Sequence, residues 1–88
     1  MKADFIVKDQ AMDDFYYWSQ HDNKLPKKII ELLESIRTTP FQGIGKPEGL
    51  KGDLAGYWSR RINDEHRLVY AVKKDLIIII SARSHYKK

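Results

Sequence analysis

The sequence contains no cysteine, which excludes disulfide bonds, thiolate zinc sites and cysteine nucleophiles. A small domain without such cross-links points to a reducing compartment. No apolar run approaches the ~18 residues that a membrane-spanning helix needs, and the N-terminus lacks the apolar segment of a signal peptide. With only five glycines and three prolines, the chain is neither collagen-like nor of low complexity. We therefore expect a soluble, cytoplasmic protein that forms one domain over residues 1–88.

The charge of the chain is unevenly distributed. The formal net charge is +4, with 16 Lys and Arg against 12 Asp and Glu. Residues 1–45 contain six basic and seven acidic side chains, whereas residues 46–88 contain ten basic and five acidic ones. The positive excess therefore lies in the second half of the chain. An excess of this sign favours an anionic partner, either nucleic acid or an acidic protein.

The first half of the chain predicts a short strand followed by a helix. Residues 5–7 form an apolar run that is consistent with a strand. A helix is expected from Asp9, whose side chain can cap the first turn, to residues 20–23. Residues at helical spacing are expected to form its inner face: Ala11, Met12, Phe15, Tyr16 and Ser19.

A second helix is expected to complete a helical hairpin. Pro26 suits its first turn, and Asn23 or Lys24 can precede that turn as the cap. Pro40 ends the helix at residues 38–39. Its apolar stripe is expected to consist of Ile29, Ile30, Leu33 and Ile36.

The second half of the chain predicts an antiparallel meander after a loop. Residues 40–56 hold all five glycines and read as a structured loop without the spacing of a phosphate-binding loop. Short polar connections favour hairpins between the segments that follow. The expected strands are Tyr57–Ile62, His66–Val72 and Leu76–Ala82. The isoleucine run 77–80 suggests a central strand covered on both faces. The predicted fold is α+β: a twisted antiparallel sheet with a helical hairpin packed on one face.

Two arginines of the first hairpin form the clearest candidate site. If residues 63–65 are the turn, Arg61 lies opposite Arg67, on the same face as Ser59 and Val69. Cations directly opposite each other repel, unless an anion such as a phosphate or carboxylate lies between them. The alternative is a pair of solvated arginines that contact the acidic residues of the turn.

The end of the chain offers a second titratable group. His85 has a side chain whose usual pKa, about 6.5, suits proton transfer near neutral pH. If the last strand is unbroken, Ser81, Arg83 and His85 share one face and Tyr86 lies on the other. An idle surface histidine is the alternative. The three histidines have no metal-ligand spacing, so no metal site is expected, and alternation makes His66 a residue of the core edge or the helix packing.

A loop carboxylate and two tryptophans complete the candidates. Glu48 lies between Lys46 and Lys51, where a carboxylate can act as a general base near cations or can simply be solvated. Trp18 and Trp58 can stack on bases, but core packing is the better interpretation for both.

Several of these segments together resemble the Txe/YoeB toxins, which are RelE-like ribonucleases of bacterial toxin–antitoxin systems. The resemblance covers nearly the whole chain, and its length and order make it specific. The matching segments are Asp13-Asp14-x-x-Tyr17-Trp18, Thr39-Pro40-Phe41-x-Gly43-x-Gly45, Lys46-Pro47-Glu48-x-Leu50-Lys51, Leu54-x-Gly56-x-Trp58-Ser59-Arg60-Arg61-Ile62, Glu65-His66-Arg67-Leu68-Val69-Tyr70 and His85-Tyr86.

The resemblance implies ribosome-dependent cleavage of mRNA without a metal or other cofactor. The nucleophile is the 2′-hydroxyl of the RNA itself, so the protein must supply a base, an acid and charge stabilisation. By the resemblance, Glu48 matches the base, Arg67 stabilises the phosphate, and His85 matches the acid that protonates the 5′-oxygen. The products are a 2′,3′-cyclic phosphate or its 3′-phosphate and a 5′-hydroxyl.

The resemblance also implies further contacts and partners. Arg61, Lys51 and Tyr86 are expected to contact the substrate. The expected partners are an antitoxin of the Phd/YefM type and the ribosome with its mRNA. The sequence leaves open whether the chain forms a homodimer and whether it binds DNA through the antitoxin complex. Two features depart from the family pattern: Gly49 replaces a proline after the loop glutamate, and Lys87-Lys88 extend the end.

Two other functions use the same basic face. One is a non-catalytic module that binds RNA or an acidic partner, and the other is a ParE-like relative that inhibits DNA gyrase. Neither needs Glu48, Arg67 and His85 together, so this combination favours the nuclease.

Overall fold

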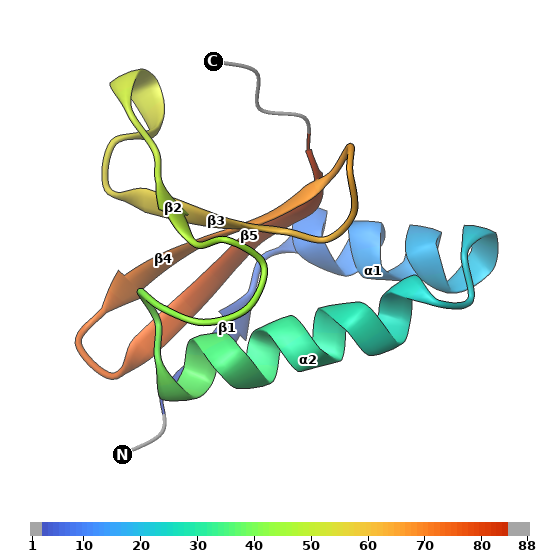
Figure 1. Ribbon diagram of the computed structural model, residues 1–88, viewed down its shortest axis with the longest axis horizontal. Coiled ribbons are helices and arrows are strands. Elements are labelled where there is room, and N and C mark those ends of the chain that lie inside the picture. Colours follow the sequence, from blue (N-terminus) through green and yellow to red (C-terminus); the bar gives the residue numbers. More distant parts are fainter. Residues whose placement is uncertain (1–2, 85–88) are drawn as a thin grey trace.

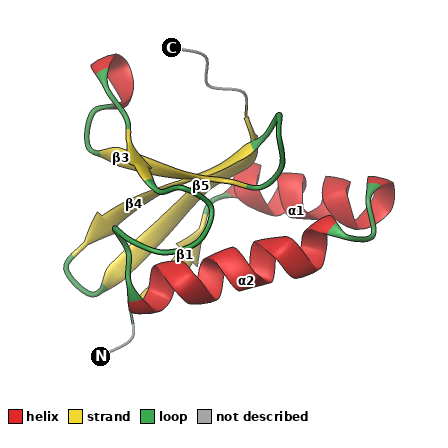
Figure 2. Ribbon diagram, viewed as in Figure 1, coloured by secondary structure: helices red, strands yellow, loops and turns green. Residues whose placement is uncertain are grey.

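The chain folds into two helices that lie against one face of a five-stranded sheet (Figure 1, Figure 2). The structure is a computed structural model that describes residues 3–84. Its elements are β1 (Asp4–Val7), α1 (Asp9–His21), α2 (Leu25–Thr38), β2 (Glu48–Gly49), the 3-10 turn η1 (Gly52–Leu54), β3 (Tyr57–Arg61), β4 (Arg67–Lys73) and β5 (Leu76–Ser84). The α+β class and the helical hairpin on one face are confirmed. Neither helix of the described part is long and apolar enough to cross a membrane.

The sheet is mixed rather than wholly antiparallel. Its strand order is β1-β5-β4-β3-β2, and β1 runs parallel to β5, with Phe5 opposite Ile77. The prediction of an antiparallel sheet is wrong for this pair, because strands far apart in the sequence have no turn that fixes their direction. The predicted loop 40–56 also contains β2 and η1, which are too short to show a periodic pattern.

The buried face of α1 differs from the predicted one. Ala11, Asp14 and Trp18 are buried, whereas Met12 and Tyr16 are 55% and 68% exposed. The helix is rotated because Asp14 and Trp18 both bond to β5, a tertiary contact that the hydrophobic pattern of one helix cannot show. The helix ends at His21, as predicted. The predicted cap is wrong, since Lys8 occupies that position and makes no side-chain capping bond.

The stripe of α2 is also shifted by part of a turn. Ile29 and Ile36 are buried as predicted, but Ile30 is 65% exposed. The buried set is Leu25, Ile29, Leu32 and Ile36, which follows the 3.6-residue period of a helix more closely than the predicted set. Lys24 is the cap and Pro26 lies in the first turn, so the predicted start of this helix is confirmed.

The isoleucine run forms the inner strand β5, between β1 and β4. Ile77 and Ile79 are fully buried in the core under the helices, but Ile78 and Ile80 are only half-buried. The prediction that both faces are covered is therefore wrong, because both helices pack on the same side of the sheet. The face without helices is called the uncovered face below, although Ser59 and Val69 on it are themselves fully buried.

Candidate catalytic face of the sheet

The β3–β4 hairpin has the register that the sequence predicts. Arg61 lies opposite Arg67, and the Ile62 amide donates to the His66 carbonyl at 2.9 Å. The Asn63 side chain closes the turn, since its Oδ1 accepts the amide hydrogen of His66 at 2.7 Å. Local turn chemistry therefore places the two arginines opposite each other on the uncovered face.

Arg67 is held in place by three different groups. Its Nε donates to Ser59 Oγ at 2.7 Å, and its Nη2 donates to the Lys46 carbonyl at 3.0 Å. Nη2 also lies 3.7 Å from Glu48 Oε1. Partial burial, followed by the nearby charge of Arg61, lowers the pKa of Arg67 below its ordinary value. Two like charges are thus held together near one carboxylate, an arrangement that an added anion would stabilise.

Glu48 reaches Arg67 because β2 adds a fifth strand to the sheet. Glu48 pairs with Ser59 in the β2–β3 ladder, which puts its carboxylate on the uncovered face. Its side chain is 37% exposed, compared with 16% for Arg67. The carboxylate is therefore accessible to a ligand, while the arginine is fixed behind it.

The two other basic candidates have fewer contacts. Arg61 is exposed, and within residues 3–84 its charge acts on the neighbouring Arg67. Lys51 is the residue before η1, and its side chain is exposed. Within residues 3–84 it makes no hydrogen bond with Arg67.

Two residues of this site were missed as functional positions. Ser59 is the acceptor for Arg67, and strand alternation already placed it on the correct face. The carbonyl of Lys46 has no signal in the sequence, because its direction depends on a backbone with φ of +52°.

The last strand does not run unbroken, so part of the predicted tail geometry is wrong. Val69 pairs with Ser81 but Arg67 pairs with Ser84, which leaves one extra residue in β5 between these pairs. The Arg83 guanidinium lies 3.5 Å from the ring centre of Tyr17 in α1, on the helical side of the sheet. Arg83 therefore does not share a face with Ser81, contrary to the predicted alternation.

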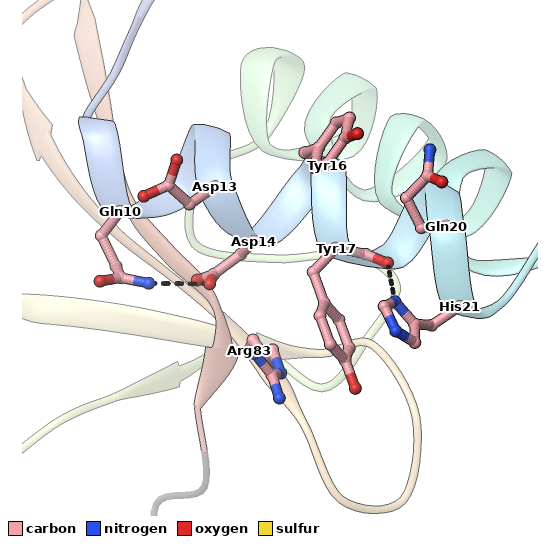
Figure 3. A pocket seen from close by; sticks show the side chains of 8 residues that line it. All are labelled: Gln10, Asp13, Asp14, Tyr16, Tyr17, Gln20, His21 and Arg83. Atoms are coloured by element: carbon pink, nitrogen blue, oxygen red, sulfur yellow. Dashed lines mark hydrogen bonds between the residues drawn. The ribbon is translucent and has the colours of Figure 1, made fainter.

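Helix α1 secures the irregular part of β5. The amide of Ala82 donates to Asp14 Oδ2 at 2.8 Å, and its carbonyl accepts from Trp18 Nε1 at 2.7 Å. The adjacent Tyr17 ring stacks on His21 with ring centres 4.0 Å apart (Figure 3). Asp14, Tyr17 and His21 line an open pocket of about 370 Å³ together with Arg83. The Asp-Asp-x-x-Tyr-Trp motif thus fixes the end of β5 next to Arg67.

The remaining candidates have mixed outcomes. His66 packs edge-on against Trp18 with ring centres 5.0 Å apart, which confirms its predicted role in helix packing. Trp18 is buried in the core and Trp58 packs against this core, as predicted for both. His85, Tyr86 and the Lys87-Lys88 extension lie outside the described residues.

The fold is of the RelE-like type. A chain of the toxin–antitoxin complex RelBE2 from Mycobacterium tuberculosis has the same fold, with a TM-score of 0.75 over 98% of this chain and 100% of that one at 17% identity. The sequence profile of the YoeB-like toxins of bacterial type II toxin–antitoxin systems matches residues 7–86. The chain therefore belongs to the YoeB toxin family.

Individual relatives agree closely with this assignment. Toxin YoeB of Escherichia coli K12 is 52% identical over 81 residues, covering 92% of this chain and 96% of that protein. The YoeB dimer from Staphylococcus aureus has a TM-score of 0.89 at 49% identity, covering 98% of this chain and 100% of that one. The heterotetrameric YoeB–YefM complex from the same species has a TM-score of 0.85 at 49% identity with the same coverage.

Proposed function

We propose that the protein is an endoribonuclease that cleaves translated mRNA in the ribosomal A site. The observation that carries the proposal is the 3.7 Å approach of the Glu48 carboxylate to the fixed Arg67 guanidinium, beside a second arginine. A base next to a cationic pair is the combination that attack of a 2′-hydroxyl on its own phosphate needs.

In the proposed reaction, Glu48 removes the proton of the 2′-hydroxyl as its oxygen attacks the adjacent phosphorus. Arg67 and Arg61 stabilise the charge that develops on the phosphoryl oxygens. The bond to the 5′-oxygen breaks, and His85 returns a proton to that oxygen. A 2′,3′-cyclic phosphate and a 5′-hydroxyl result, without a metal ion. Tyr86 and Lys51 complete the proposed contacts with the substrate.

The comparisons support two protein partners for this chain. Because the related S. aureus toxin forms a complex with YefM, we propose that an antitoxin of the same type neutralises this toxin. Because that relative is also described as a dimer, we propose self-association as a second partnership. The ribosome and its mRNA complete the set, and the cytoplasm is the compartment where they meet.

The test is primer extension on a translated message after expression without antitoxin. We expect cuts within A-site codons for the parent and a rate at least ~100-fold lower for Glu48→Gln, since the variant keeps the shape but loses the base. Glu65→Gln is the matched control, because it removes an exposed carboxylate from the turn of the same hairpin. Uncut message together with gyrase-dependent DNA breaks would favour the ParE-like alternative. Uncut message with retained RNA binding would favour the non-catalytic module.

A further inference from the structure

Arg60, the residue between Ser59 and Arg61, is not part of the catalytic face. Its side chain is fully buried, with 0% exposure, on the helical side of β3. All five N–H hydrogens of a guanidinium have an oxygen acceptor here. The acceptors are Tyr70 Oη (3.1 Å from Nε), Ser35 Oγ and the Ile44 carbonyl (2.6 and 3.2 Å from Nη1), and the Thr39 and Gln42 carbonyls (2.7 Å each from Nη2).

Every one of these acceptors is a neutral oxygen rather than a carboxylate. Ser35 belongs to the last turn of α2, and Thr39 is the residue that caps its end. The carbonyl end of a helix carries partial negative charge, which partly compensates the buried cation. A buried charge without a carboxylate partner is costly, so these contacts must all be in place together. The guanidinium therefore imposes one conformation on the segment of residues 39–45, which supplies the Thr39, Gln42 and Ile44 carbonyls.

The glycines of this segment allow it to wrap around the guanidinium. Gly43 has φ of +122° and Gly45 has φ of +83°. A Cβ atom at Gly43 would collide with Ser35 Oγ and lie 3.0 Å from Arg60 Nη1. The Gly-x-Gly pattern thus encloses the protein's own cation, which explains its presence in a loop without phosphate-binding spacing.

The enclosed segment continues directly into the catalytic face. The Gly45 carbonyl accepts the Arg61 amide hydrogen at 2.6 Å, and the next carbonyl, that of Lys46, accepts from Arg67. Two residues later, Glu48 enters the ladder with β3. A change in the path of residues 39–45 would therefore move the Lys46 carbonyl, Arg67 and Glu48 together.

We propose that Arg60 is a positioning residue for the Glu48–Arg67 pair. It acts by fixing residues 39–45, and with them the carbonyl that orients Arg67. This inference rests on the proposed nuclease function, but its effect on the loop can be measured without any cleavage assay.

The test replaces Arg60 by lysine and measures single-turnover cleavage of mRNA on translating ribosomes. Lysine keeps the charge but has three donors and no planar fork. We expect the maximal rate to fall about 100-fold, as a displacement of about 1 Å at a reacting pair can cause. The toxin concentration that gives half the maximal rate should change little, because Arg60 does not touch the substrate. In hydrogen exchange, the Arg61 amide should exchange faster in the variant.

The matched control is Ile77→Ala, which alters a fully buried residue of β5 that takes part in none of these hydrogen bonds. If Ile77→Ala loses as much Tm as Arg60→Lys does, it should still keep the parent's cleavage rate. The Arg61 amide should also keep its slow exchange in this control. If Arg60→Lys fails to fold, Ser35→Ala takes its place and should lower the rate about tenfold, since one bond to a charged group is lost.

A folded Arg60→Lys that cleaves within about threefold of the parent and retains slow Arg61 exchange would overturn the inference. An equal fall in the Ile77→Ala control would also overturn it, because general destabilisation would then explain the effect. If the parent itself leaves every message intact, the nuclease proposal fails, and the exchange measurement alone decides whether Arg60 fixes the loop.

Discussion

Replacing Gly45 by alanine should destabilise the protein much more than the same change at Gly56. Both glycines have positive φ, +83° and +95°, so an alanine is strained by about 1–2 kcal/mol at either position. A Cβ at Gly45 would also lie 2.7 Å from Leu32 Cδ2 and 3.1 Å from Arg60 Cβ, whereas nothing lies within 4 Å at Gly56. Crowding of this kind costs about 1–3 kcal/mol.

Alanine also restricts the unfolded chain, which stabilises both variants by about 0.4–1 kcal/mol. The expected loss in free energy of unfolding is therefore about 3 kcal/mol for Gly45→Ala and about 1 kcal/mol for Gly56→Ala. Equilibrium unfolding in urea, followed by tryptophan fluorescence, measures both values if the m-values match that of the parent. Two losses that agree within about 0.5 kcal/mol would refute the close packing of this loop against Arg60.

Three further changes test separate contacts. Asp14→Ala should lower the free energy of unfolding by about 2–3 kcal/mol in urea titrations, because the buried amide of Ala82 loses its charged acceptor, and an unchanged midpoint would contradict this. Ser59→Ala should lower single-turnover cleavage about tenfold, because Arg67 Nε loses its acceptor; cleavage at the parent's rate would show that the bond is dispensable. Burial, opposed by Arg60, raises the pKa of Tyr70, so its neutral form adds stability below pH ~10 that is lost as the pH rises towards the folded-state pKa. The difference in unfolding free energy between the parent and Tyr70→Phe should therefore be constant up to about pH 9 and shrink as the pH rises above ~10. A difference that stays constant above pH ~10 would exclude this linkage.

The β3–β4 hairpin was predictable because the information that sets its register is local. Asn63 lies where its side chain can close the turn, and strict alternation then puts Arg61 opposite Arg67. The position of Glu48 was not predictable in the same way. It depends on a two-residue strand and on the conformation of the preceding loop, which is set by a contact with β3.

The errors in the inner face of α1 and in the end of β5 have one common origin. Hydrophobic periodicity favoured Met12 and Tyr16 as inner residues, but the buried positions include the charged Asp14. Asp14 is buried because the extra residue in β5 frees the Ala82 amide from the sheet. The same extra residue moves Arg83 to the helical side. A hydrophobic pattern that is evaluated separately for each helix or strand cannot show the burial of Asp14 or the shift of Arg83.

The positive charge of the second half is therefore divided between different tasks. On β3, alternation buries Arg60 against the loop and leaves Arg61 on the uncovered face, although the two are adjacent and chemically identical. Arg83 contributes to the packing on α1 instead of the catalytic face. A count of basic residues therefore overstates the positive charge on the uncovered face, because at least Arg60 and Arg83 have structural contacts elsewhere. On the uncovered face, Ser59, the Lys46 carbonyl and Glu48 contact Arg67, and we propose that the buried Arg60 keeps this arrangement in place.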